Sequence, residues 1–188
     1  MLVAGVDEVH YGCIFGPVYA AAVIVPQKFH AALAREGVRD SKQIMKESER
    51  RHLARLIQES CICGISYCTV LEMQQMGWKK ATDEAMRRAL AALGRKPDLL
   101  QVDGITPLQG YSGRQKAIVG GDQTILEISA ASIIAKVAAD DAVVAMAEKY
   151  PYYDLERNKG YFSPAHQRGI EKHGMSPEHR NYRIRKAA

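Results

Sequence analysis

Four carboxylates of this chain stand at or just after the ends of apolar segments that are expected to be strands. They are Asp7, Glu8, Asp103 and Asp122. If the strands are neighbours in one sheet, these acids converge at the edge where the sites of open α/β sheets gather. Crowded like charges are unfavourable unless cations neutralise them, and oxygen ligands favour Mg²⁺ or Mn²⁺. The pattern therefore predicts a site for two such ions about 4 Å apart, the arrangement that hydrolyses phosphodiester bonds.

Each acid taken alone has a simpler interpretation. Glycines stand beside two of them, at Gly104 and at Gly120-Gly121. Asp and Gly commonly form the turn that follows a strand, so a single acid of this kind is better explained as a turn residue. Acids at three strand ends together favour a functional site.

Length and composition are those of an ordinary globular protein. The chain has 188 residues, of which 47% are hydrophobic and 25% are charged. These values exclude intrinsic disorder as the main state and predict one domain, or one domain with a small appendage. No apolar run reaches the roughly 20 residues that span a bilayer. Without a signal peptide led by Lys or Arg, the expected location is cytoplasmic.

The positive charge is concentrated at one end of the chain. Residues 156–188 hold eight Lys or Arg and three Glu, while the rest of the chain is balanced and the net charge is +5. A basic end on a neutral body indicates a polyanionic partner such as a nucleic acid. A tail that only increases solubility remains the alternative.

Hydrophobic patterning predicts strands and helices that alternate along the chain, which is typical of the α/β class. A Ser-Pro pair at 163–164 predicts a helix start, and Gly174 predicts its end. The expected strands cover residues 2–6, 18–25, 61–70, 99–102 and 116–119, and the expected helices cover 48–59, 81–93 and 125–149.

Cysteines do not indicate a zinc site in this chain. Cys61, Cys63 and Cys68 lie in an expected strand, and their spacing matches no zinc finger or ribbon. Together with Cys13, they are expected to be free and buried.

Short motifs in a fixed order make the chain resemble the ribonuclease HII family over residues 2–180. The opening strand carries Asp-Glu at 7–8, and Ser-Ala-Ala-Ser begins the long helix signature at 129. The other matching segments lie at 16–18, 40–42, 102–104, 121–122, 158–161 and 179–180. Many such matches in register are far more specific than any one of them.

This resemblance implies a ribonuclease-H-like mixed β-sheet flanked by helices, with a helical C-terminal extension. Residues 1–150 would form the catalytic domain and residues 151–188 a basic substrate-binding segment. The four acids would hold two Mg²⁺ or Mn²⁺ ions. The implied activity is endonucleolytic cleavage of RNA in RNA–DNA hybrids, or 5′ to a ribonucleotide embedded in DNA, giving 3′-hydroxyl and 5′-phosphate ends. The expected oligomeric state is a monomer.

The resemblance also implies roles for residues outside the acid cluster. Asp140 would support the acids, unless it is only a solvated helix residue. Lys42 would contact a backbone phosphate, and Tyr161 would stack on the nucleotide at the RNA–DNA junction. Their alternatives are a plain surface lysine and an aromatic packed over the tail. Arg180 would line the duplex. No role is assigned to His166 and His173, which are expected to be surface histidines.

One segment departs from the family pattern. Where the family has Gly-Arg-Gly, which grips the 2′-hydroxyl and nearby phosphates, this chain has His10-Tyr11-Gly12. His10 adds a Cβ where close approach is expected, and Tyr11 lacks the charged fork of arginine but can stack. This departure leaves three alternatives open. Specificity for a single embedded ribonucleotide is weakened, or His10 and Tyr11 form a different sensor of the ribonucleotide. The third alternative is that the chain binds hybrids poorly and has another nucleic-acid role.

A protein that binds RNA–DNA hybrids without cleaving them is the main alternative function. The intact acid set favours the enzyme, because a binding protein has no need of carboxylates that repel one another. The long-helix and Lys-Gly-Tyr motifs also disfavour a Holliday-junction or transposase-type nuclease.

Overall fold

A mixed five-stranded sheet forms the centre of the computed structural model, which describes residues 1–39 and 44–181. The strand order is β3-β2-β1-β4-β5. Strand β1 is antiparallel to β2 and parallel to β4, β2 is antiparallel to β3, and β4 is parallel to β5. The strands are β1 (Val3–Val9), β2 (Val18–Ile24), β3 (Ile62–Cys68), β4 (Leu99–Asp103) and β5 (Gln115–Ile118).

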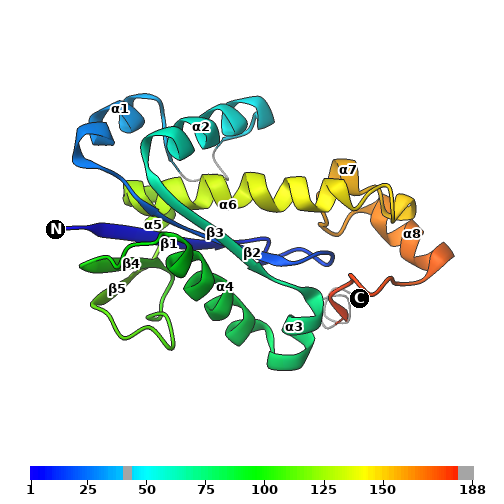
Figure 1. Ribbon diagram of the computed structural model, residues 1–188. Coiled ribbons are helices and arrows are strands. Elements are labelled where there is room, and N and C mark those ends of the chain that lie inside the picture. The colour runs from blue at the N-terminus through cyan, green and yellow to red at the C-terminus, as the bar shows by residue number, and fades with distance from the viewer. Residues whose placement is uncertain (40–43, 182–188) are drawn as a thin grey trace.

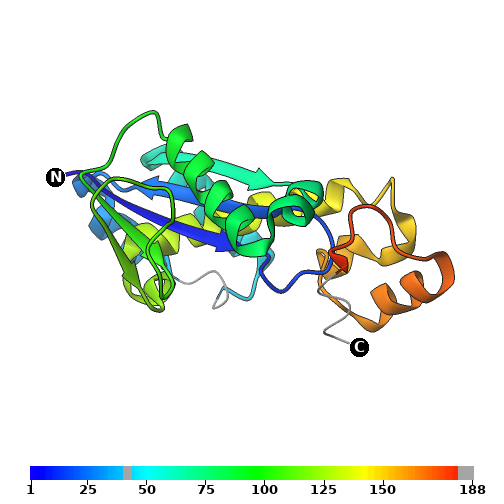
Figure 2. The same cartoon turned by 90° about the horizontal axis from the view of Figure 1, so that it is seen from below.

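Helices cover both faces of this sheet, as Figures 1 and 2 show. On one face α6 packs on β1 and β2 with α2 beside it, and on the other face α4 packs on β2 and β3. The helices are η1 (Gln27–Phe29), α1 (His30–Arg35), α2 (Glu47–Ser60), α3 (Val70–Met76), α4 (Trp78–Ala92), α5 (Gly121–Thr124), α6 (Leu126–Ala145), η3 (Pro151–Tyr153), α7 (Leu155–Asn158) and α8 (Pro164–His173).

Side-chain alternation along the central strands builds two cores. Ala20 and Ala22 of β2 face the α4 side, while Ala21 and Val23 face the α6 side. Small residues let the layers approach closely, and a Cβ at Gly5 would lie 2.3 Å from the backbone of α6. The sheet is therefore buried on both faces, and its polar groups collect at the strand ends.

The structure confirms the expected α/β class, with a mixed sheet, flanking helices and a helical C-terminal extension. Three boundaries differ by three residues or more. Strand β1 runs on through Asp7 to Val9, α4 begins at Trp78, and α6 ends at Ala145. Helix α3 was not expected, although its capping box from Thr69 to Glu72 is a sequence signal for a helix start.

The C-terminal helices pack against the loop that joins β1 to β2. Phe15 of this loop pairs with His179 in a β-bridge, and the backbone N–H of Arg180 donates to the carbonyl of Ile14 at 2.7 Å. Ser163 caps α8 as expected, since its side chain accepts from the backbone of His166. The segment from η3 to α8 lies at one end of α6, opposite the N-terminus (Figures 1 and 2).

Two further expectations concern membrane-spanning segments and the cysteines. None of the described helices is both long and apolar enough to cross a bilayer. The four cysteines are free, with Cys13 and Cys68 buried but Cys61 and Cys63 only half-buried. Burial raises the pKa of the Cys13 thiol to about 11.

Candidate active site

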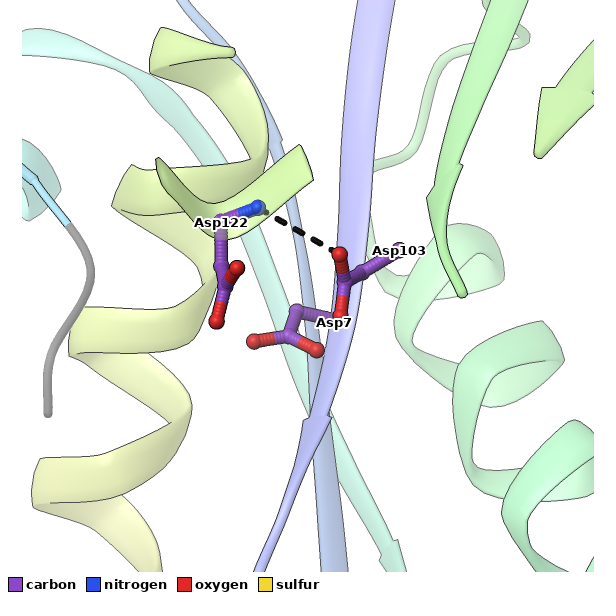
Figure 3. Close-up of side chains that lie close together, drawn as sticks. All are labelled: Asp7, Asp103 and Asp122. Carbon is purple, nitrogen blue, oxygen red and sulfur yellow. Dashed lines mark hydrogen bonds between the residues drawn. The ribbon is translucent and has the colours of Figure 1, made fainter. Parts of the chain in front are cut away.

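Three aspartates meet at one edge of the sheet. Asp7 comes from β1, Asp103 ends β4 and Asp122 lies in α5, and one ligand oxygen from each lies within 4.8 Å of the others. Figure 3 shows the three carboxylates gathered between β1 and α6. Because β1 and β4 are parallel neighbours, their carboxyl ends reach the same edge. The predicted convergence therefore holds for these three acids.

The turn before α5 brings Asp122 into the cluster. Gly120 has φ +64°, a conformation that favours glycine, and a Cβ at Gly121 would lie 2.5 Å from the end of the Ile128 side chain of α6, which would have to move. The backbone N–H of Asp122 donates to Oδ1 of Asp103 at 3.3 Å (Figure 3). Ser129 of α6 donates its hydroxyl to the Asp122 carbonyl at 2.7 Å. The turn is therefore fixed to both the sheet and α6.

Glu8 lies beside the cluster but outside the group of three. Successive residues of a strand point to opposite faces, so Asp7 faces α6 whereas Glu8 lies on the side of Val6 and the α4 core. Its half-buried side chain lines the same pocket as Asp7 and Asp103. The structure therefore places the fourth predicted acid at the margin of the site.

Electrostatic repulsion within the cluster suits a cation. Burial raises the pKa of Asp7 well above its ordinary value, and the neighbouring charges of Glu8 and Asp103 raise it further. A hydrogen bond from Ser132 opposes this shift, and Asp122 adds to it. All donors are carboxylate oxygens, the ligands that Mg²⁺ and Mn²⁺ prefer, so the residues fit such an ion.

A pocket of about 450 Å³ opens over the acids. The loop after β1, side chains of α6 and the C-terminal segment also line it. These lining residues include His10, Tyr11, Gly12, Lys136 and Tyr161. Lys42 lies outside the described residues.

His10 does not present its ring to this pocket as a substrate contact would. The ring is buried, and its Nε2 lies 2.8 Å from Oδ1 of Asp140, which also accepts from Lys136 at 2.8 Å. His10 has φ +67°, a conformation that favours glycine, and its buried Nδ1 has no hydrogen-bond partner within the described residues. Such unfavourable features persist where the surroundings fix them, as at functional sites.

Asp140 is the internal partner of His10. Asp140 is only 5% exposed, so the alternative of a solvated helix acid is wrong. Burial opposes ionisation, but the hydrogen bond from His10 and the charge of Lys136 keep the pKa of Asp140 below its ordinary value. Burial lowers the pKa of His10 to about 4, so the imidazole is neutral at pH 7 and the ion pair is that of Asp140 with Lys136.

Three other predicted contact residues line the open part of the pocket. Tyr11 is 55% exposed and packs edge-to-face on Trp78, with ring centroids 5.1 Å apart. A Cβ at Gly12 would contact the ring of Tyr161 at 3.6 Å. The ammonium of Lys136 lies 4.9 Å from the ring centroid of Tyr161. Tyr11, Lys136 and Tyr161 therefore share one pocket with Asp7, Glu8 and Asp103.

Arg180 does not lie where a duplex-lining residue would. It is 2% exposed, and its guanidinium donates to backbone carbonyls of the loop between β1 and β2. The acceptors are His10 at 2.6 Å, Cys13 at 3.2 Å, Gly16 at 2.7 Å and Pro17 at 2.6 Å. The planar fork of arginine suits several carbonyls at once, so Arg180 positions the loop from inside.

A buried histidine pair links Tyr161 to the segment before Arg180. His166 Nδ1–H donates to the Tyr161 carbonyl at 3.2 Å, because a carbonyl can only accept. Its bare Nε2 then accepts from His179 at 3.1 Å, and His179 Nδ1 accepts from the backbone of Ser176 at 2.9 Å. Both rings are therefore neutral.

Sequence reasoning placed His166 at the surface, and this is wrong. His166 lies on the inner face of α8 with Gly169 and Ile170, a spacing of three and four residues that indicates the buried side of a helix. His173 is exposed, as expected, and stacks on Tyr152, with the two ring centroids 3.7 Å apart.

The histidine pair makes stability depend on pH. Burial, followed by the neighbouring His166, lowers the pKa of His179 from 6.5 to about 4. The stabilisation from the neutral ring is complete above pH 6.5 and is lost as the pH falls towards 4, which costs about 3 kcal/mol. In urea unfolding from pH 7 to 4, we expect stability to fall less steeply in His179→Gln than in the parent, whereas the exposed control His173→Gln follows the parent. Parallel curves for parent and His179→Gln would contradict this.

Sequence comparison relates this chain to known proteins over almost its whole length. The model of the ribonuclease HII family matches residues 4–186. The chain is 46% identical over 180 residues to ribonuclease HII of Trichodesmium erythraeum, covering 95% of this chain and 85% of that protein. Identity to ribonuclease HII of Prochlorococcus marinus strain NATL2A is 42% over 180 residues, covering 95% and 92%.

Solved structures agree with the sequence relatives. Ribonuclease H2 from Pyrococcus horikoshii OT3 superimposes with a TM-score of 0.84 at 26% identity, covering 99% of this chain and 96% of that one. Bst-RNase HIII in complex with Mn²⁺ shares the fold, with a TM-score of 0.77 at 20% identity, covering 100% and 69%. Family model, relatives and fold coincide over almost the whole chain, and the chain therefore belongs to the ribonuclease HII family of phosphodiester-cleaving endonucleases.

Proposed function

We propose that this chain is a divalent-metal-dependent endoribonuclease. It cleaves RNA in RNA–DNA hybrids, or 5′ to a ribonucleotide embedded in duplex DNA, and leaves 3′-hydroxyl and 5′-phosphate ends. The observation that carries the proposal is the set of three aspartate oxygens within 4.8 Å beneath an open pocket. Membership of the ribonuclease HII family supports the choice of substrate.

Two Mg²⁺ or Mn²⁺ ions would be held by Asp7, Asp103 and Asp122, with Glu8 contributing from the margin. When bound, such ions neutralise the carboxylates and polarise both the attacking water and the scissile phosphate. The Mn²⁺ complex of Bst-RNase HIII, a protein of the same fold, supports a metal of this kind.

The chain's own residues bind and orient the substrate around this centre. Ser132 holds Asp7 by a hydrogen bond, and Asp103 accepts from the Asp122 backbone, so the carboxylates are oriented before substrate arrives. Tyr161 is proposed to stack on the nucleotide at the RNA–DNA junction, and Gly12 lies beside its ring, where a Cβ would contact it at 3.6 Å. Asp140 acts indirectly by holding His10.

Residues 1–150 are proposed to carry the chemistry, and residues 151–188 to hold the duplex. In the described part of that segment, three cationic side chains lie at the surface: Arg157, Arg168 and Lys172. Phosphate contacts by such residues give affinity without sequence preference.

One cleavage assay tests the proposal. Three end-labelled duplexes, with one ribonucleotide, four ribonucleotides and a full RNA strand, are incubated with Mg²⁺, Mn²⁺ or EDTA. We expect metal-dependent products with 3′-hydroxyl ends from at least one duplex, and none from Asp7→Asn. Duplex binding without a metal-dependent product at any ribonucleotide length would overturn the proposal in favour of a non-catalytic hybrid-binding protein.

A further inference from the structure

Tyr11 and His10 are neighbours in sequence but have opposite environments. The ring of His10 is buried against Asp140, whereas Tyr11 is 55% exposed and lines the pocket above the acids. The exposure of this large aromatic ring at a charged pocket calls for an explanation. A buried aromatic ring or an exposed polar residue would be the ordinary choice at such a position.

The structure supports Tyr11 from the protein side. Its ring packs edge-to-face on Trp78, at an interplanar angle of 75°. The guanidinium of Arg180 lies 5.2 Å from the centroid of the same Trp78 ring. Arg180 also holds the carbonyls of His10 and Cys13, on either side of Tyr11. Both the ring and the backbone of Tyr11 are therefore held in place before any ligand binds.

A ring fixed in this way is suited to stacking. Aromatic side chains give a large contact area with little loss of conformational entropy, and prior fixation reduces that loss further. Stacking on a nucleotide tolerates any sequence and needs no charge. A neutral phenol releases no counterions from phosphate, so its contribution to binding is insensitive to salt. The cationic side chains that line the same pocket are Lys136 and Arg50.

We infer that Tyr11 is a binding platform that stacks on the apolar face of a nucleotide beside the scissile bond. Trp78 and Arg180 hold the platform, and His10, anchored to Asp140, sets the backbone from which it projects. The inference rests on the proposed function, because it takes a ribonucleotide-containing duplex as the ligand. It assigns the affinity at this position to ring contact rather than to a salt-sensitive phosphate contact.

The test measures binding rather than cleavage. In the full chain carrying Asp7→Asn, with Mg²⁺ present, dissociation constants for a fluorescent single-ribonucleotide duplex are measured by anisotropy from 50 to 200 mM KCl. Tyr11→Ala should weaken binding about ten-fold with an unchanged salt slope. Tyr11→Phe should recover most of that loss, because it keeps the ring. Tyr11→Arg should steepen the logarithmic salt slope by about 0.9, the value for one added phosphate contact.

Tyr67 provides the matched control. It is 46% exposed and stacks on Tyr19, but it lies on β3 away from the acids. Tyr67→Ala should leave the dissociation constant within two-fold of the parent. If Tyr11→Ala binds as tightly as the parent while its thermal stability falls, Tyr11 only covers Trp78 and the inference is overturned.

Failure of this inference differs from failure of the proposed function. Metal-dependent cleavage by the unmodified chain, together with unchanged binding by Tyr11→Ala, would reject the platform alone. Absence of cleavage by the unmodified chain would reject the enzyme, while the binding series would still report on Tyr11.

Discussion

Replacing Asp7 by asparagine should abolish cleavage and, without divalent ions, stabilise the fold. The loss of one carboxylate from the metal site should lower the cleavage rate by roughly 10³-fold or more, since bound ions supply several kcal/mol of transition-state stabilisation. The gain in stability follows from the raised pKa of Asp7, which means that the folded state favours the neutral side chain. Asparagine reproduces that neutral form at every pH.

The difference in stability between the parent and Asp7→Asn should depend on pH. A carboxyl group whose pKa is raised by folding stabilises the fold below its unfolded pKa of about 4, and this contribution is lost as the pH rises through the folded value. Parent and Asp7→Asn should therefore be equally stable near pH 3 in EDTA, and the variant should exceed the parent by about 1 kcal/mol at pH 7. Millimolar Mg²⁺ should reduce or reverse the difference, because it binds the folded parent more tightly.

Asp83 offers a matched control for this measurement. It is also buried, but it forms an ion pair with Lys79 rather than facing other acids. Asp83→Asn should therefore lower the free energy of unfolding at pH 7, opposite in sign to Asp7→Asn. A parent that is more stable than Asp7→Asn in EDTA at pH 7 would mean that the acids do not repel one another as their placement implies.

Replacing Arg180 by methionine should destabilise the fold by about 3–5 kcal/mol. Methionine fills a similar volume but donates no hydrogen bond, so four buried loop carbonyls each lose a hydrogen bond. Arg180→Lys should lie between parent and methionine variant, because an ammonium keeps the charge without the planar fork. Urea unfolding at pH 7 measures these differences.

Arg180→Met should weaken duplex binding as well as stability. The loop released from Arg180 carries Tyr11 and Gly12, so this part of the pocket lining loses its fixed geometry. Arg157→Met is the control, since the Arg157 side chain is 87% exposed and its removal should change stability by less than about 0.5 kcal/mol. If Arg180→Met were as stable as the parent, water or another donor would have to satisfy the loop carbonyls.

The positions of the three aspartates were predictable because local signals set them. Apolar runs mark β1 and β4, Asp7 and Asp103 follow these runs, and parallel pairing brings both to one edge. Asp122 follows the Gly120-Gly121 pair, a local signal for the turn after β5. Strand alternation would also have separated Glu8 from Asp7, had β1 been extended to Val9. The Ser163 cap of α8 and the α/β class were likewise predictable from local sequence.

The sequence by itself determined the fold class, the five strands, the longer helices and the acids, because these depend on periodicity and on neighbours a few residues away. Tertiary structure alone decided that His10 turns inward, that Arg180 lies inside the protein and that His166 pairs with His179. A polar side chain can be buried only where the fold supplies its partner, and the partners of His10 and Arg180 lie 130 and more than 160 residues away in the chain. No local pattern reveals such a partner.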